Sequence, residues 1–191
     1  MNFTKAELRI QYRRRRKALT PQQIDDLSIL IVNRCLELKL WDQSTYHLFM
    51  SFRKNNEIDT SLLLSVIQGK DKQPVIPKMV GDHDLEHYLL LDQTPIKINQ
   101  WGIPEPQSGI KIDSEQIEVV FVPLLIFDLQ GHRVGYGKGY YDRFLAKCKP
   151  GTIKVGLSFF DPIERIKDIE SHDIPIDFGV TPNKSYEFSS F

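Results

Sequence analysis

The segment VVFVPLLIFDLQGHRVGYGKGYYDRFL, residues 119–145, contains three elements that together determine the fold. Residues 119–127 are almost entirely apolar, which is typical of a strand buried on both faces in the middle of a sheet. A turn at 128–131 follows, then a loop with glycine at every second position, and then a helix over 139–149. A buried strand, a glycine-rich loop and a helix, in this order, predict an α/β domain.

The flanking sequence continues this alternation of helices and strands. Capping-box patterns that begin at Thr4 and Thr20 predict one helix from about residue 5 to Thr20 and a second from Pro21 to about Leu40. A shorter helix is expected at 60–68. Apolar runs predict further strands at 45–52, 73–79, 85–91 and 152–159.

Residues 92–116 contain three prolines, two glycines and no clear period, so we expect a long loop. Loops of this length in compact domains are often functional. At 191 residues, one domain accounts for the whole chain, 1–191. We therefore expect a single α/β domain with a mostly parallel central sheet flanked by helices, and a ligand site at the carboxyl ends of the strands.

The composition is that of an ordinary soluble protein and argues against several classes of partner. Lys and Arg number 25, as do Asp and Glu, so the net charge of zero provides no field for nucleic acid or membrane. No segment approaches the ~20 apolar residues of a membrane-spanning helix. Cys35 and Cys148 match no zinc or redox spacing, and we expect reduced thiols in a cytoplasmic protein. We expect a monomer, with a weak dimer as the alternative.

A run of basic residues at 13–17 is the feature that would suggest a nucleic-acid patch. Consecutive residues on a helix point in all directions, so such a run forms no single basic face. We expect Arg13, Arg15 and Arg16 on the solvated surface and leave Arg14 open.

Glycines 135, 137 and 139 surround Lys138 directly ahead of a helix. Missing side chains let phosphate oxygens approach the backbone amides, and the helix start and the lysine add positive charge. The pattern is neither a P-loop, because Gly139 follows the lysine, nor a dinucleotide fingerprint, because Tyr140 stands three residues after Gly137. It predicts a phosphate cradle, and the alternative is a glycine-rich turn that merely closes a strand–helix joint.

Neighbouring aromatic and imidazole side chains have different expected environments. Tyr141 shares a helical stripe with Leu145 and should face the core, whereas Tyr140, rotated by about 100°, is freer to meet a ligand. The histidines show no metal-ligand spacing, and we expect His132 and His172 to lie in loops without a role.

The segment FVPLLIFDLQGHRVGYGKGYYDRFL, 121–145, resembles the signature of the 5-formyltetrahydrofolate cyclo-ligase family, also called 5,10-methenyltetrahydrofolate synthetases. KAELR at 5–9, the stretch around Glu57, WGIPEP at 101–106 and ESHDIPID at 170–177 resemble the other family segments in order and spacing. The resemblance covers nearly the whole chain. It implies a reaction in which ATP phosphorylates the formyl oxygen on N5 of 5-formyltetrahydrofolate, N10 attacks the activated carbon, and phosphate leaves with ADP as the other product.

The resemblance also implies functional residues. Lys138 and Arg133 are implied as catalytic residues. The implied ATP site consists of Lys5, Arg9, Arg133, Gly135, Tyr136, Gly137, Lys138, Gly139, Tyr140 and Tyr141. The implied folate site consists of Met50, Glu57, Trp101, Tyr136, Gly137, Lys138, Gly139 and Tyr140, with Phe52 as a further wall residue. Asp142 and Asp173 are implied as Mg²⁺ ligands, and Asp177 is expected to start the closing strand instead.

Several of these residues have a simpler interpretation when considered alone. By composition Glu57 is an exposed loop acid, and Asp142 is an acid that complements the dipole at a helix start. The alternative function is a non-catalytic nucleotide- or phosphate-binding α/β module. Such a module would need neither Glu57 nor the WGIPEP segment.

Overall fold

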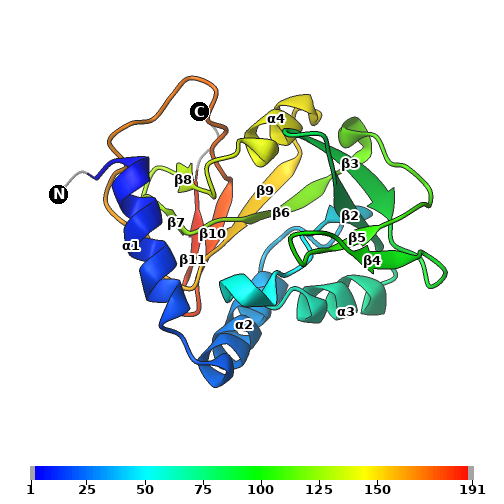
Figure 1. The fold of residues 1–191 in the computed structure, drawn as a ribbon, viewed down its shortest axis with the longest axis horizontal. Helices are drawn as coiled ribbons and strands as arrows, with labels where there is room; N and C mark the ends of the chain where they lie inside the picture. The colour runs from blue at the N-terminus through cyan, green and yellow to red at the C-terminus, as the bar shows by residue number, and fades with distance from the viewer. Residues whose placement is uncertain (1–2, 189–191) are drawn as a thin grey trace.

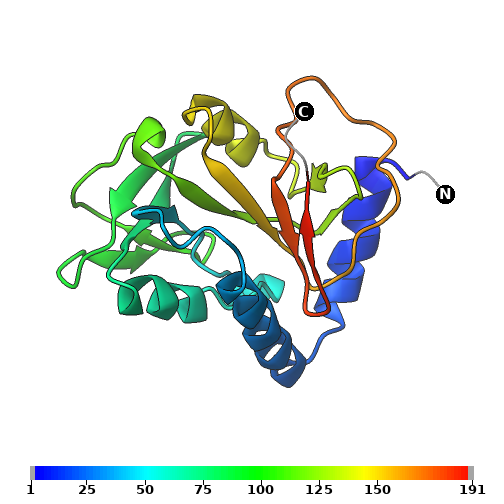
Figure 2. The same ribbon diagram turned by 180° about the vertical axis from the view of Figure 1, so that it is seen from behind.

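Within residues 3–188, the part of the chain described by this computed structural model, seven strands form the central sheet in the order β11-β10-β9-β6-β1-β2-β3 (Figures 1 and 2). The sheet strands are β1 (Thr45–His47), β2 (Gln73–Val80), β3 (Asp84–Leu89), β6 (Val119–Pro123), β9 (Ile153–Leu157), β10 (Phe178–Val180) and β11 (Ser185–Glu187). The inner strands β10, β9, β6, β1 and β2 are parallel, and the edge strands β3 and β11 are antiparallel. This confirms the predicted α/β domain with a mostly parallel sheet.

Helices cover both faces of the sheet. They are α1 (Lys5–Lys17), α2 (Pro21–Leu36), α3 (Ser61–Gly69) and α4 (Tyr140–Lys147), with short 3-10 turns η1 (Arg53–Asn55) and η2 (Ser114–Gln116). Helices α2 and α3 lie on one face, α4 lies on the other, and α1 stands at the side (Figure 1).

Strand β6 connects the two hydrophobic cores because its side chains alternate between the faces. Val119 and Phe121 pack in the core beneath α2 and α3, and Val120 and Val122 pack in the core beneath α4. All four side chains are fully buried. The prediction of a central strand that is apolar on both faces is confirmed.

The chain leaves β1 and β6, which are neighbours, toward opposite sides of the sheet. After β1 it forms α3 and returns as β2, whereas after β6 it forms α4 and returns as β9. In open α/β sheets a ligand crevice forms at such a switch point, beyond the carboxyl ends of the strands. The residues that follow His47 and Pro123 are therefore placed beside one crevice.

Two small antiparallel sheets correct the predictions for two segments. The predicted strand 119–127 is divided, because β6 ends at Pro123 and the chain continues as β7 (Ile126–Phe127), which pairs with β8 (Arg133–Val134). Proline has no N–H to extend the ladder, which favours an end there. The predicted loop 92–116 contains β4 (Ile96–Ile98) paired with β5 (Pro104–Pro106). Prolines are tolerated in β5 because it is an edge strand.

Element ends were predicted less well than element starts. Both capping boxes form, but α1 ends at Lys17 and α2 ends at Leu36 rather than near Leu40. The indole of Trp41 donates to the Cys35 carbonyl over 2.9 Å and satisfies an acceptor at the end of α2. Similarly, the predicted strand 45–52 is only β1, and the predicted helix 139–149 is the shorter α4.

Helix α1 packs against the β7–β8 hairpin through a small apolar cluster. Leu8 and Tyr12 on α1 are buried against Leu125, Ile126 and Val134. The hairpin leads directly into the glycine-rich loop, so this contact positions α1 beside the loop. Within residues 3–188 no helix has the length and apolar character needed to cross a membrane.

Two histidines are buried side by side between the sheet and α4. His47 on β1 and His87 on β3 have ring centroids 5.1 Å apart, and both contact Phe144. None of their ring nitrogens has a hydrogen-bond partner within the described residues. Burial, together with the neighbouring His87, holds the pKa of His47 well below 6.5, and burial lowers the pKa of His87 to about 4.

This pair predicts acid sensitivity. The unfolded chain takes up protons on these imidazoles near pH 6.5 and the folded chain does not, so stability is complete above that pH and falls as pH approaches 4. His87→Leu should remove roughly 3 kcal/mol of this loss, as judged by denaturant unfolding at several pH values. His83→Leu, in the exposed β2–β3 turn, is the matched control. Equal pH slopes for wild type and His87→Leu would contradict the assignment.

Candidate functional site

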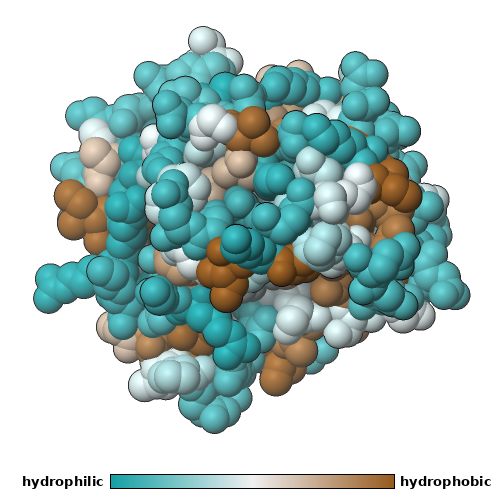
Figure 3. Space-filling view, turned by 45° about the vertical axis from the view of Figure 1, so that its right-hand side comes forward, coloured by the Kyte–Doolittle hydropathy of each residue, from teal (hydrophilic) through white to brown (hydrophobic). Residues whose placement is uncertain are grey.

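A cavity of about 420 Å³ opens at the carboxyl ends of β1 and β6, within the usual size range of ligand pockets. Its walls come from α1, the segments after β1 and β6, the start of α4, the loop at 168–173, and residues of β2, β3 and β5. The space-filling view shows a largely hydrophilic surface with hydrophobic patches beside a recess (Figure 3). The cavity therefore lies at the switch point between β1 and β6, where the sheet topology predicts a ligand crevice.

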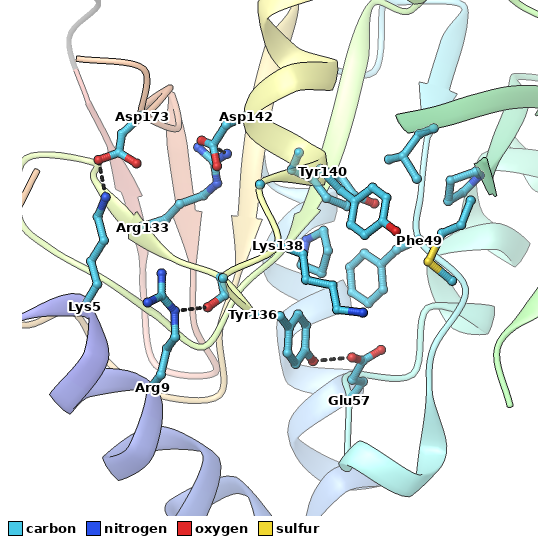
Figure 4. Close-up of a pocket in the computed structure, with 18 of the residues that line it drawn as sticks. Lys5, Arg9, Phe49, Glu57, Arg133, Tyr136, Lys138, Tyr140, Asp142 and Asp173 are labelled. Atoms are coloured by element: carbon cyan, nitrogen blue, oxygen red, sulfur yellow. Dashed lines mark hydrogen bonds and ion pairs between the residues drawn. The ribbon is translucent and has the colours of Figure 1, made fainter. Parts of the chain in front are cut away.

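The glycine-rich loop forms one wall, and α1 fixes its backbone. The Nε of Arg9 donates to the carbonyl of Gly135 over 3.1 Å (Figure 4). Gly137 has φ +92° and Gly139 has φ +69°, a region that L side chains rarely adopt. Gly139 is also the N-cap of α4 and provides no side-chain cap, so the first amides of this helix remain available.

Lys5, Arg9 and Arg133 line one end of the cavity, and the Lys138 ammonium points from the glycine-rich loop toward Glu57 at the other end (Figure 4). Lys5 is buried and pairs with Asp173. Arg133 donates to the Ile174 carbonyl and to Asp142, the latter over 2.6 Å. Burial lowers the pKa of Arg133, and the charges of Asp142 and Asp173 oppose that shift. This concentration of positive charge suits a polyanionic ligand.

Asp142 lies beside the segment that carries Asp173, because the Ile174 amide donates to Asp142 over 3.3 Å and the charges of both aspartates act on Arg133. Burial raises the pKa of Asp173, but hydrogen bonds from Lys5 and the Glu170 amide outweigh burial and hold that pKa below its usual value. Each carboxylate uses one oxygen in protein contacts. Within residues 3–188 the second oxygen of each accepts no hydrogen bond, so both could reach a cation.

Glu57 lies at the opposite end of the cavity and is not the exposed loop acid that composition suggests. Its Oε1 accepts a hydrogen bond from the Tyr136 hydroxyl, and its Oε2 accepts one from the Phe52 amide at 2.8 Å (Figure 4). Burial raises the pKa of Glu57, while the bonds from Tyr136 and Phe52 and the charge of Arg16 act in the opposite direction. Burial and the Glu57 charge raise the pKa of Tyr136.

The apolar wall next to Glu57 is only partly the one expected. Met50 lines the cavity, as expected. Phe52 does not, because its ring packs against Gly102, and Phe49 lines the wall instead. Trp101 lies outside the lining, 45% exposed, with the Lys138 ammonium 5.5 Å from its ring centroid.

Tyr140 and Tyr141 both line the cavity. Tyr141 also packs into the core, as expected, but its buried hydroxyl has no partner within the described residues. Burial raises its pKa. His132 does not line the cavity, whereas His172 does, with its Nε2 3.4 Å from Glu170 Oε2.

The arginine run is only partly on the solvated surface. Arg14 is exposed, and Arg15 is exposed over the Tyr12 ring. Arg13 is exposed but donates to the Tyr136 carbonyl over 3.0 Å. The expectation for Arg16 was wrong, because its side chain is buried and donates to the Tyr136 hydroxyl.

Sequence reasoning missed part of the lining. The missed residues come from several separate segments, and they are Ala6, Phe49, Pro77, Met79, Leu85, Ile103, Glu105, Pro123, Asp168 and Glu170. Three of them had a signal in sequence, because Ile103 and Glu105 belong to WGIPEP and Glu170 begins ESHDIPID. Glu105 is buried, and its Oε1 accepts a hydrogen bond from the Met79 amide at 3.0 Å.

The fold and this cavity define an α/β protein with a cationic, glycine-lined end and an apolar end that contains a buried carboxylate. The model of the 5-formyltetrahydrofolate cyclo-ligase family matches residues 2–182. The chain is 32% identical to a probable 5-formyltetrahydrofolate cyclo-ligase of Schizosaccharomyces pombe, over 96% of this chain and 98% of that protein. It is 29% identical to 5-formyltetrahydrofolate cyclo-ligase of Haemophilus influenzae, over 92% and 97%.

Solved structures agree with these comparisons. The NMR structure of Aquifex aeolicus 5,10-methenyltetrahydrofolate synthetase superposes with a TM-score of 0.84 at 28% identity, covering 98% of this chain and 94% of that chain. The chain therefore belongs to the 5-formyltetrahydrofolate cyclo-ligase family, and it is an enzyme of that class.

The glycine loop provides a test of its backbone geometry. In Gly137→Ala the new methyl would sit at φ +92° and 3.1 Å from the Nε of Arg9, so we expect a loss of about 1–2 kcal/mol in unfolding free energy. At Gly135 a methyl meets nothing within 4 Å, and Gly135→Ala should stay within about 0.5 kcal/mol of wild type. Denaturant unfolding measures both. Equal losses in the two variants would show that the loop conformation differs.

Proposed function

We propose that this enzyme closes 5-formyltetrahydrofolate to 5,10-methenyltetrahydrofolate at the expense of ATP. The γ-phosphoryl group passes to the formyl oxygen on N5, and ADP forms. N10 then attacks the activated carbon, and inorganic phosphate leaves with that oxygen. An amide-like oxygen is a poor leaving group, and its phosphate ester is a good one.

One observation carries this proposal. A single cavity has a cationic, glycine-lined end and an apolar end with a buried carboxylate. The first suits a triphosphate, and the second suits a flat ring with N–H donors. A catalyst that holds two ligands in one enclosure replaces their random encounter with a fixed geometry. A phosphate-binding module without catalysis would not need the Glu57 end.

At the cationic end, Lys5, Arg9 and the amides of residues 135–139 are proposed to hold the phosphates. Arg133 and Lys138 are the proposed catalytic residues, because they provide charge along the path of the transferred group. Lys5 pairs with Asp173 and Arg133 pairs with Asp142. Phosphate oxygens would take over these cations when the nucleotide binds.

At the other end, Glu57 is proposed to accept the paired N–H donors of the pterin ring, with Met50 and Phe49 as apolar wall. Tyr136 and Tyr140 complete this wall from the glycine loop. Trp101, beside Lys138 at the rim, is proposed to cover the bound ring.

Asp142 and Asp173 are the residues that would hold Mg²⁺, since each has one uncommitted oxygen close to the phosphate end. This donor set fits Mg²⁺, which usually takes one or two carboxylates and fills its other positions with water and phosphate. When bound, the ion would neutralise phosphate charge.

The test of the reaction is a mixture of protein, MgATP and 5-formyltetrahydrofolate. Absorbance of the methenyl product should rise only when ATP is present, with one phosphate released per product molecule. Product without ATP consumption, or ATP hydrolysis without product, would contradict the proposal.

Glu57→Gln tests the folate end. The substitution keeps size but replaces one acceptor oxygen with a donor, so the folate KM should rise roughly ten- to hundredfold. The KM for ATP should stay within about twofold, because the cationic end is untouched. Initial rates with each substrate varied in turn measure both constants. The reverse pattern would place Glu57 outside the folate site.

A magnesium titration of the initial rate tests the two aspartates. Asp142→Asn and Asp173→Asn should each raise the Mg²⁺ concentration for half-maximal rate, by roughly tenfold for the loss of one ligand charge. Asp177→Asn is the control, since Asp177 binds the backbone and side chain of Lys154 and does not line the cavity. Unchanged midpoints in both variants would remove the aspartates from the metal site.

A further inference from the structure

Arg16 is a buried cation directly behind the cavity. Its side chain is 6% exposed, and it does not line the cavity itself. Its Nη2 donates to the Tyr136 hydroxyl over 2.5 Å, and its guanidinium carbon lies 5.2 Å from the Tyr136 ring centroid. Tyr136 in turn donates its hydroxyl hydrogen to Glu57. A chain of hydrogen bonds therefore runs from Arg16 through Tyr136 to Glu57.

The backbone of Arg16 is fixed to the same turn that carries Glu57. The Asn56 side-chain amide donates to the carbonyls of Arg16 and Leu19, each over 3.1 Å. Asn56 adopts the left-handed conformation with φ +50°, which asparagine tolerates better than most residues. The end of α1 is thus joined to the turn that carries Glu57 in two ways. The Asn56 side chain binds backbone carbonyls at the end of α1, and the Arg16 side chain is connected to Glu57 through Tyr136.

Burial of the Arg16 charge is costly unless an opposite charge compensates it. The Nε of Arg16 has no hydrogen-bond partner within residues 3–188. The carboxylate of Glu57, reached through Tyr136, is the anion at the end of the hydrogen-bond chain. Burying the Arg16 charge therefore costs stability that a purely structural contact would not require. A need for the Glu57 charge in ligand binding accounts for this cost.

Arg16 also belongs to the helix that serves the phosphate end. Lys5, Arg9 and Arg16 are separated by four and seven residues, so they share one face of α1. Lys5 pairs with Asp173 and Arg9 holds Gly135, whereas Arg16 donates to Tyr136, which in turn donates to Glu57. One helix face thus lines the cationic end of the cavity and supports the Glu57 end from behind.

We propose that Arg16 is a positioning residue for the folate, which holds Tyr136 against Glu57 and so directs the Glu57 carboxylate into the cavity. The proposal rests on the proposed role of Glu57 in binding the pterin ring. Charged or titratable groups from the other elements around this part of the cavity include Tyr136 and Lys138 from the glycine loop, Tyr140 and Tyr141 from α4, and Glu105 from β5.

The direction of the pH effect follows from the charges. Burial raises the pKa of Glu57, and the Arg16 charge lowers it. Without Arg16 the Glu57 carboxyl protonates at higher pH, and a protonated carboxyl cannot accept two N–H donors. Folate binding should therefore weaken at a higher pH than in wild type.

The test is Arg16→Gln, with kcat and the folate KM measured from about pH 5.5 to about pH 8.5. We expect the folate KM to rise roughly ten- to hundredfold and its increase at low pH to begin at a higher pH than in wild type. The KM for ATP should change by less than about twofold. Arg16→Lys, which keeps the charge, should restore the wild-type pH profile. Titration calorimetry with 5-formyltetrahydrofolate alone gives the same comparison without turnover.

Arg14→Gln is the matched control, because Arg14 is exposed on the same helix and does not line the cavity. It should keep the wild-type profile. If Arg16→Gln raises both KM values equally with an unshifted pH profile, Arg16 is structural and the proposal is wrong. If wild type binds and cyclises the folate but Arg16→Gln has a wild-type folate KM, this proposal alone fails. If the wild type binds no folate, the proposed function fails with it.

Discussion

The divergence of the chain after β1 and β6 is the constraint on which the site depends. These parallel neighbours end at the same edge of the sheet, and the connections that follow them turn to opposite sides. The segment after β1 carries Phe49, Met50 and Glu57, and the segment after β6 leads to the glycine loop. Both must pass over one edge, so the crevice between them receives side chains from each. The two ends of the cavity follow from this topology.

Compensation of charge is the second organising feature. Each of the buried cations Lys5, Arg16 and Arg133 is matched by an acid or by a hydrogen-bond chain to one. Buried charges are tolerated only when they are paired. The pairing keeps the side chains in place before ligands arrive, which reduces the cost of ordering them on binding. Within the described part of the chain, these pairs fix the positions of side chains that are proposed to bind or position the ligands.

Much of this architecture could be predicted from sequence, for local reasons. Val119 to Val122 are apolar at every position, which indicates a strand buried on both faces, and the capping boxes at Thr4 and Thr20 mark helix starts. The end of α2 could not be predicted, because it depends on the Trp41 indole folding back onto Cys35. The burial of Arg16 depends on Tyr136, 120 residues away, and no local pattern reports such a contact. Similarly, nothing local distinguishes Phe49 from Phe52 as the cavity wall.

The central claim is that this cavity brings the formyl oxygen to the phosphoryl group of ATP. The most direct measurement is the fate of that oxygen. With 5-formyltetrahydrofolate labelled by oxygen-18 at the formyl group, a single turnover with MgATP should release inorganic phosphate that carries one labelled oxygen. Unlabelled phosphate, formed while the methenyl product accumulates, would contradict the account.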